Sequence, residues 1–133
     1  MKTTISRVNI NNLELLHTAF EDYLKLYNDV EDKTEEQIIQ LATKLLEDCY
    51  NNGWVYWDYQ DYSALWNDII KNPALIASCT LQECIILLTW VQRESFSSGS
   101  QHTLITRTQD EILPRLVKQV YFQSSEQLRI ANE

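Results

Sequence analysis

The sequence predicts an all-α protein with about five helices packed around a central apolar helix at residues 81–94, and one short extended aromatic segment at residues 54–60. The chain has 133 residues, which suits a single helical domain over 1–133 that needs neither a metal nor disulfides to hold its core. It contains two Gly and two Pro, too few for the many tight turns of a sandwich or barrel. Apolar residues also recur at spacings of three and four along most of the chain.

The first predicted helix covers residues 13–27. Asn11 or Asn12 can cap its N-terminus, and the polar segment 28–33 ends it. Its apolar residues fall on one face because they are three or four positions apart. They are Leu13, Leu16, Phe20, Leu24 and Tyr27, with His17 beside them.

A capping box predicts the start of the second helix. Thr34 can accept a hydrogen bond from the amide of Gln37, whose side chain can reach back to the backbone of Thr34. An apolar stripe follows over residues 38–49. The Asn-Asn-Gly segment 51–53 tolerates the left-handed backbone that ends many helices.

Aromatic and β-branched residues dominate the next stretch, 54–60, and show no helical period. This pattern is typical of an extended segment or short strand. A third helix follows, with Asp61 or Ser63 as its cap. It stops at Asn72, because the residue before Pro73 avoids helical backbone angles.

The segment 81–94 is the predicted central helix. Thr80 and Glu83 form a second capping box at its start. The helix is apolar almost all round, and such a helix belongs in the middle of a domain. A Ser-rich loop is expected over residues 95–101.

The last strong helical pattern covers residues 111–122. Pro114 fits there only if it lies in the first turn, where its missing N–H costs no hydrogen bond. The tail at residues 124–133 either adds a turn or frays.

Charge is concentrated in the N-terminal half. The net charge is −8, and residues 14–61 hold twelve acids against three lysines. Such a surface repels phosphates, so we expect no direct binding to nucleic acid or to an anionic membrane. No apolar run reaches the roughly 18 residues that cross a bilayer. We expect instead an acidic docking face for a protein partner, formed by Glu31, Asp32, Glu35 and Glu36.

The three cysteines, Cys49, Cys79 and Cys84, indicate a reducing compartment. Their number is odd, each lies beside apolar residues, and the first ten residues carry no apolar signal core. A cytoplasmic protein with buried thiols is therefore expected. The spacing of the cysteines does not match a zinc site, and no cofactor motif is present, so no metal or cofactor is expected.

Two regions of the sequence together suggest a pocket, between the aromatic segment 54–66 and the loop 95–102. In this reading Asp58 is a candidate acid or base and Arg93 a candidate anion holder, assisted by Glu94 and His102. The full candidate set is Trp54, Trp57, Asp58, Trp66, Arg93, Glu94, Phe96 and His102.

An aromatic-Asp-aromatic segment at Trp57, Asp58 and Tyr59 is followed by an Asn-Pro turn at 72–73 and by Arg93, Phe96 and Gly99. With this pattern, residues 55–116 resemble a bacterial family of uncharacterised proteins, domain of unknown function 6508. The resemblance implies a single helical domain and leaves the activity open. Where that family often has a second basic residue before the Phe, this chain has Ser95, which weakens any two-arginine anion site. The resemblance rests on Trp57, Asp58, Tyr59, Trp66, Asn72, Pro73, Leu87, Leu88, Thr89, Arg93, Phe96, Gly99, Leu113, Arg115 and Leu116.

The leading functional hypothesis is a small non-enzymatic protein-interaction or regulatory module. It rests on the acidic N-terminal half and on the lack of any catalytic motif in the sequence. One alternative is a small-molecule-binding or enzymatic domain that uses the pocket between 54–66 and 95–102. A further alternative is a DNA mimic that inhibits a nucleic-acid enzyme, with carboxylates in place of phosphates. In every case the apolar stripes of 13–27 and 38–49 also allow a homo-oligomer.

Overall fold

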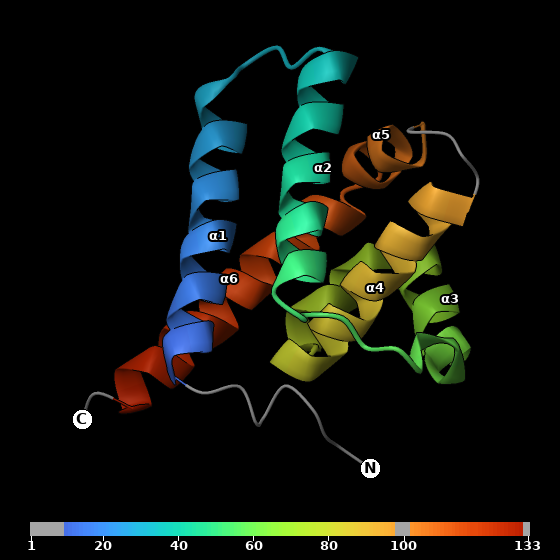
Figure 1. Cartoon of the computed structure of the whole chain (residues 1–133). Coiled ribbons are helices and arrows are strands. Elements are labelled where there is room, and N and C mark those ends of the chain that lie inside the picture. Colours follow the sequence, from blue (N-terminus) through green and yellow to red (C-terminus); the bar gives the residue numbers. More distant parts are fainter. Residues whose placement is uncertain (1–9, 98–101, 132–133) are drawn as a thin grey trace.

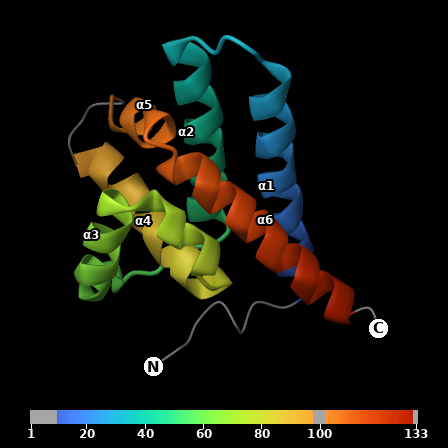
Figure 2. The same cartoon turned by 180° about the vertical axis from the view of Figure 1, so that it is seen from behind.

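The computed structural model describes residues 10–97 and 102–131. Within those residues every regular element is a helix, which confirms the all-α prediction. Two long helices, α1 (Ile10–Asp29) and α2 (Glu35–Asn51), stand side by side and antiparallel (Figure 1). A third long helix, α6 (Ile112–Ala131), crosses them diagonally on one side, as Figure 2 shows from behind.

Both ends of α1 differ from the prediction. The helix begins at Ile10, so Asn11 and Asn12 lie inside it and neither is its cap. It ends at Asp29, two residues beyond the predicted boundary. The apolar face is as expected, because Leu13, Leu16 and Phe20 are all buried.

The start of α2 confirms the capping box. The Gln37 amide donates to Thr34 Oγ1 at 3.2 Å, and the Thr34 amide donates to Gln37 Oε1 at 2.9 Å. At the other end Gly53 takes the left-handed conformation, with φ +76°. Asn52 does not, with φ −100°, so the glycine alone carries the left-handed turn.

The aromatic segment is extended over less of its length than predicted. Residues 54–56 have no regular structure, and the chain then turns into the 3-10 helix η2 (Tyr59–Tyr62). The Tyr56 amide donates to Thr89 Oγ1 at 3.1 Å. Its hydrogen-bond acceptor is therefore a side chain of a helix and not the backbone of a neighbouring strand. The turn forms because the Asp61 amide donates to the Asp58 carbonyl oxygen at 3.0 Å.

Helix α3 (Ser63–Lys71) follows η2 directly. Its cap position is Tyr62 and has no side-chain hydrogen bond, so the caps predicted at Asp61 and Ser63 are wrong. The preceding 3-10 turn supplies the backbone geometry that a cap would otherwise set. The helix stops before Pro73, as predicted, and a second 3-10 helix, η3 (Pro73–Ser78), continues the chain.

Helix α4 (Leu81–Ser97) begins with the second predicted capping box. The Glu83 amide donates to Thr80 Oγ1 at 3.1 Å, and the Thr80 amide donates to Glu83 Oε1 at 2.8 Å. The helix packs against α5, α6 and η2, and its buried residues lie on every side. It continues past the predicted end at 94 to Ser97, so residues 95–97 of the expected loop are helical, and residues 98–101 lie outside the described residues.

Helix α5 (His102–Gln109) has no counterpart in the prediction. Three of its eight residues are Thr and one is Ile, and both residue types have low helix propensity. Tertiary contacts hold it instead, because Leu104, Ile105 and Thr108 are buried against α2, α4 and α6.

Helix α6 carries Pro114 at its third position, as predicted, and extends through the tail that was expected to add a turn or fray. The extension is held by α1. Ser124 is fully buried, its Oγ lies 2.7 Å from His17 Nδ1, and the His17 ring stacks on Tyr121 at 4.7 Å.

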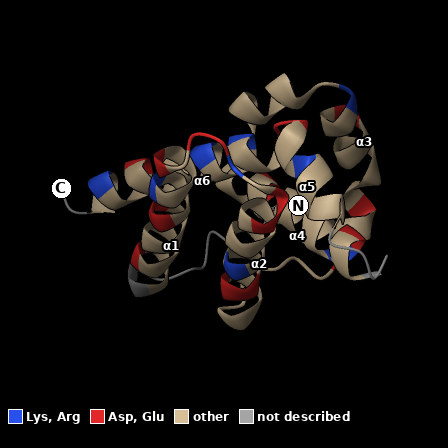
Figure 3. Ribbon diagram, turned by 90° about the horizontal axis from the view of Figure 1, so that it is seen from above, with Lys and Arg blue, Asp and Glu red and all other residues tan. Residues whose placement is uncertain are grey.

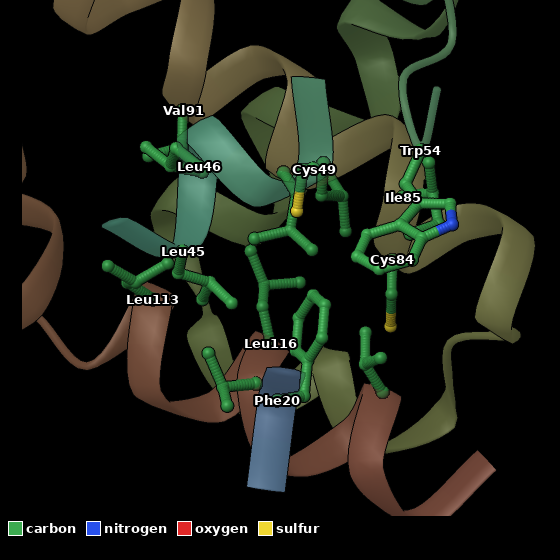
Figure 4. Close-up of a cluster of buried hydrophobic side chains, with 14 of the residues drawn as sticks. Phe20, Leu45, Leu46, Cys49, Trp54, Cys84, Ile85, Val91, Leu113 and Leu116 are labelled. Carbon is green, nitrogen blue, oxygen red and sulfur yellow. The ribbon is translucent and has the colours of Figure 1, made fainter. Parts of the chain in front are cut away.

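The core is built from side chains of α1, α2, α4 and α6 together. Figure 4 shows Phe20 of α1 close to Leu116 of α6, with Cys49 of α2 and Cys84 of α4 in the same cluster. All three cysteines are buried and free. Among the described residues no helix is long and apolar enough to span a membrane, and no three metal-ligating side chains gather into a site.

Candidate functional site

A groove of about 380 Å³ lies between α1 and α2. Leu26 of α1 is exposed, while Tyr23 and Leu45, which also line the groove, are buried. The floor is therefore apolar and continuous with the core. The residues that line it are Ala19, Asp22, Tyr23, Lys25, Leu26, Asp29, Leu41, Lys44, Leu45 and Asp48.

The lining of the groove includes three carboxylates and two amines. Lys44 Nζ lies 3.2 Å from Asp48 Oδ2, so this amine and this carboxylate form an ion pair on α2. Asp22 and Asp29 make no ion pair with any described residue, and both are exposed. The groove is thus an apolar floor whose α1 side carries Asp22 and Asp29, with the exposed Lys25 between them.

The predicted acidic face lies at the connection between these same two helices. Glu31 and Asp32 lie in the turn after α1, Glu35 and Glu36 begin α2, and all four are exposed. Figure 3 shows acidic residues along α1, this connection and α2.

The lysine within this acidic stretch, Lys33, contacts Tyr27 in the last turn of α1 and Val30 just after that helix. Its Nζ donates to the Val30 carbonyl oxygen at 2.6 Å and lies 4.0 Å from the centre of the Tyr27 ring. None of the four carboxylates forms an ion pair with a described residue, and all four face solvent.

Tyr23 ties the groove to the rest of the molecule. Burial raises the pKa of Tyr23 well above its ordinary value, and the nearby Tyr27 adds to the rise, while a hydrogen bond with Thr108 of α5 offsets it in part. The phenol is therefore neutral at physiological pH and anchors α1 to α5. The floor of the groove is held in place by this contact.

A second feature is an exposed ridge formed by Tyr50, Trp57, Arg93 and Phe96, called here the aromatic ridge. Trp57 is 62% exposed, Phe96 59% and Tyr50 54%. Tyr50 meets Trp57 edge to face, with ring centres 6.3 Å apart. The guanidinium of Arg93 lies 5.8 Å from the Trp57 ring and 6.0 Å from the Tyr59 ring. The three elements that meet are the end of α2, the segment before η2 and the end of α4.

Two hollows flank the ridge, and both are lined by Arg93 and Phe96. One, of about 500 Å³, is completed by Tyr59, Gln60, Trp90 and Glu94. The other, of about 520 Å³, is completed by Glu47, Tyr50, Asn51 and Gln92. The end of α4 thus projects between two shallow depressions.

The structure brings together only part of the predicted pocket. Trp57, Arg93 and Phe96 meet in the aromatic ridge, and Asp58 is exposed beside them. Among the described residues no ion pair joins Asp58 to Arg93, so the two form no buried structural pair.

Three other predicted residues lie elsewhere. Trp54 and Trp66 are buried in the core and line neither hollow, because their large apolar faces are covered by the helices around them. His102 is the exposed first residue of α5, and it also lines neither hollow.

The remaining predicted residue, Glu94, belongs to a clamp that sequence reasoning missed. Arg107 Nε donates to Glu94 Oε1 at 3.1 Å, and Arg107 Nη1 donates to Asp110 Oδ2 at 2.8 Å. The guanidinium also lies 5.4 Å from the ring of Trp66. Burial alone lowers the pKa of Arg107, but the hydrogen bonds that it donates to the two carboxylates, together with their negative charge, outweigh burial and raise the pKa. No local pattern marks a pair thirteen residues apart, so this clamp was not predictable.

Comparison with known proteins returns no relative: no family model, no curated protein and no solved structure matches the chain. The resemblance to domain of unknown function 6508 therefore stays a prediction. The function has to be argued from the two surfaces.

Proposed function

We propose that this protein is a non-enzymatic interaction module that binds a basic, amphipathic helical segment of a partner protein in the α1–α2 groove. The observation that carries the proposal is the combination of an apolar floor with carboxylates along one side. An amphipathic helix docks in a groove by placing side chains at spacings of three and four onto such a floor.

The apolar part of the groove supports a helical ligand. Leu26 and Leu41 come from opposite walls, and Leu45 lies beneath them. The volume of about 380 Å³ suits a few aliphatic side chains rather than a whole folded surface. Binding would therefore depend on two or three apolar anchors.

The charge of the groove supports a basic ligand. Asp22 and Asp29 are exposed and form no ion pair with any described residue, and they outnumber Lys25, the amine on the same side of the groove. The four exposed carboxylates at the connection add further negative charge nearby. Complementary charge of this kind speeds association and discriminates between partners more than it adds affinity. The apolar floor also separates this surface from a DNA mimic, which needs carboxylates alone.

The test is selection of random 16-residue peptides displayed on phage, with the purified protein as bait. We expect the enriched peptides to carry Lys or Arg together with apolar residues at helical spacing. Synthetic copies should bind with micromolar affinity and weaken at least tenfold between about 50 mM and 500 mM NaCl, since exposed charges are screened.

Two variants locate the site. Asp22→Lys with Asp29→Lys should abolish peptide binding, whereas the matched reversal Asp68→Lys, on α3 and outside the groove, should not. Enriched peptides without basic residues, equal binding to the groove variant, or no enrichment at all would each overturn the proposal.

A further inference from the structure

The aromatic ridge is a surface that the proposed function does not use. It shares no residue with the groove between α1 and α2. Three aromatic side chains here are each more than half exposed: Tyr50 and Trp57 are in edge-to-face contact, and Phe96 lines a hollow together with Tyr50. Large apolar side chains gather on the outside of a protein mainly at interaction sites. Trp, Tyr and Arg are also the residues that dominate the energy of protein interfaces.

From this ridge we infer that the protein forms a two-fold symmetric dimer, with the aromatic ridge of one copy packed against that of the other. In such a dimer the same patch lies on both sides, so the patch must complement itself in shape and in charge. The ridge meets both conditions.

The shape is self-complementary because a projection lies between two hollows. Phe96 and Arg93 line both depressions, of about 500 and 520 Å³. A two-fold axis beside this projection places the Phe96 of each copy into a hollow of the other. The rings of Tyr50 and Trp57, already in contact, then lose their exposure to water.

The charges are also self-complementary. Arg93 is exposed, its guanidinium lies over aromatic rings, and no described carboxylate pairs with it. Asp58 is exposed and lies between the two residues whose rings Arg93 covers, Trp57 and Tyr59. A two-fold axis at this point sets Arg93 of each copy against Asp58 of the other, so each dimer gains two ion pairs.

This pairing favours a second copy over an unrelated partner. A purely basic or purely acidic partner would satisfy one of the two charges and oppose the other. Opposite charges side by side on one patch are satisfied together when the patch meets itself.

The dimer is tested by sedimentation velocity over about 1–500 μM protein, a range that covers micromolar dissociation constants. We expect a concentration-dependent shift from 15.7 kDa to twice that mass. Trp57→Ser, a change at an exposed side chain, should weaken the dimer at least tenfold and leave the melting temperature unchanged at concentrations too low for either protein to dimerise.

Charge reversal provides a sharper test. Arg93→Asp alone and Asp58→Arg alone should each be monomeric, because each sets like charges against one another across the axis. An equimolar mixture of the two variants should dimerise again, since a heterodimer pairs the new Asp with the new Arg and retains the native pair.

Matched controls are Arg129→Asp at the C-terminal end of α6 and Glu14→Arg near the start of α1. Both lie on the side of the molecule away from α3 and the end of α4 (Figures 1 and 2), and neither should change the dimer. A protein that stays monomeric at every concentration, a dimer that Trp57→Ser leaves intact, or a mixture that does not recover would each overturn the inference. A small molecule bound at the ridge would leave the mass at that of one chain.

Discussion

Replacing Arg107 by Met removes the clamp between α4 and α5 while keeping most of the side chain's apolar stem. The Arg107 side chain is 16% exposed, and the carboxylates of Glu94 and Asp110 are 30% and 32% exposed. Water reaches both carboxylates, so each lost hydrogen bond costs about 1 kcal/mol, at the low end for a charged pair. Loss of the contact with the Trp66 ring adds about 0.5–1 kcal/mol.

The expected loss of unfolding free energy is therefore about 2–3 kcal/mol. For a domain of this size each kcal/mol lowers the melting temperature by about 4 °C, so Arg107→Met should melt about 8–12 °C below the wild type. Circular dichroism at 222 nm during heating measures the shift, and urea titration gives the free energy directly.

Two further variants separate the clamp from a general surface effect. Arg107→Lys keeps the charge but loses the two-pronged geometry, and should recover less than half of the loss. Arg129→Met breaks the exposed pair with Glu126 and should cost less than about 0.5 kcal/mol. If Arg107→Met melts within about 1 °C of the wild type, the argument that the clamp joins α4 to α5 is wrong.

Three other properties follow from buried groups. Burial raises the pKa of Cys79 to about 11, with a further contribution from Glu83, and raises the pKa of Cys49 further. Because the thiolate is the reactive form, the folded protein should resist Ellman's reagent at pH 8 and react fully in urea. Folded Tyr23 keeps its proton above pH ~10, whereas Tyr23 of the unfolded chain loses it. The free energy of unfolding should therefore fall by up to about 1.4 kcal/mol per pH unit above this pH. Urea titrations at alkaline pH measure the fall, and Tyr23→Phe should flatten it. Ser124→Ala removes the hydrogen bond with His17, and should cost about 1–2 kcal/mol and speed amide hydrogen exchange at the end of α6.

The parts of the fold that the sequence predicted are those set by local chemistry. Thr34 and Thr80 form capping boxes with the residue three positions later, and both boxes are present. Gly53 and Pro73 act on their own backbone, and each ends a helix where expected. These signals need no knowledge of distant residues.

The parts that were missed depend on distant residues. Helix α5 has weak intrinsic propensity and is held by α2, α4 and α6. The end of α6 is helical because Ser124 and Tyr121 contact His17 more than a hundred positions earlier. The aromatic cluster was visible in the sequence, but nothing local indicates that Trp54 turns into the core while Trp57 stays outside.

The two proposed surfaces make a joint prediction because α2 carries part of both. Leu41, Leu45 and Asp48 line the groove, and Tyr50 at the end of the same helix belongs to the ridge. A dimer formed through the ridge therefore presents two grooves on one particle. On a surface coated densely with a groove-binding peptide, two-site attachment should raise the apparent affinity by about 10²-fold over that for free peptide.

Trp57→Ser separates the two effects. It should remove the gain on the coated surface while leaving the affinity for free peptide in solution unchanged, because the groove is intact. Asp22→Lys with Asp29→Lys should abolish both. Biosensor binding at high and low peptide density, alongside calorimetry with free peptide, measures the difference. Equal behaviour of wild type and Trp57→Ser at high density would mean that the grooves act singly, even if the chain dimerises.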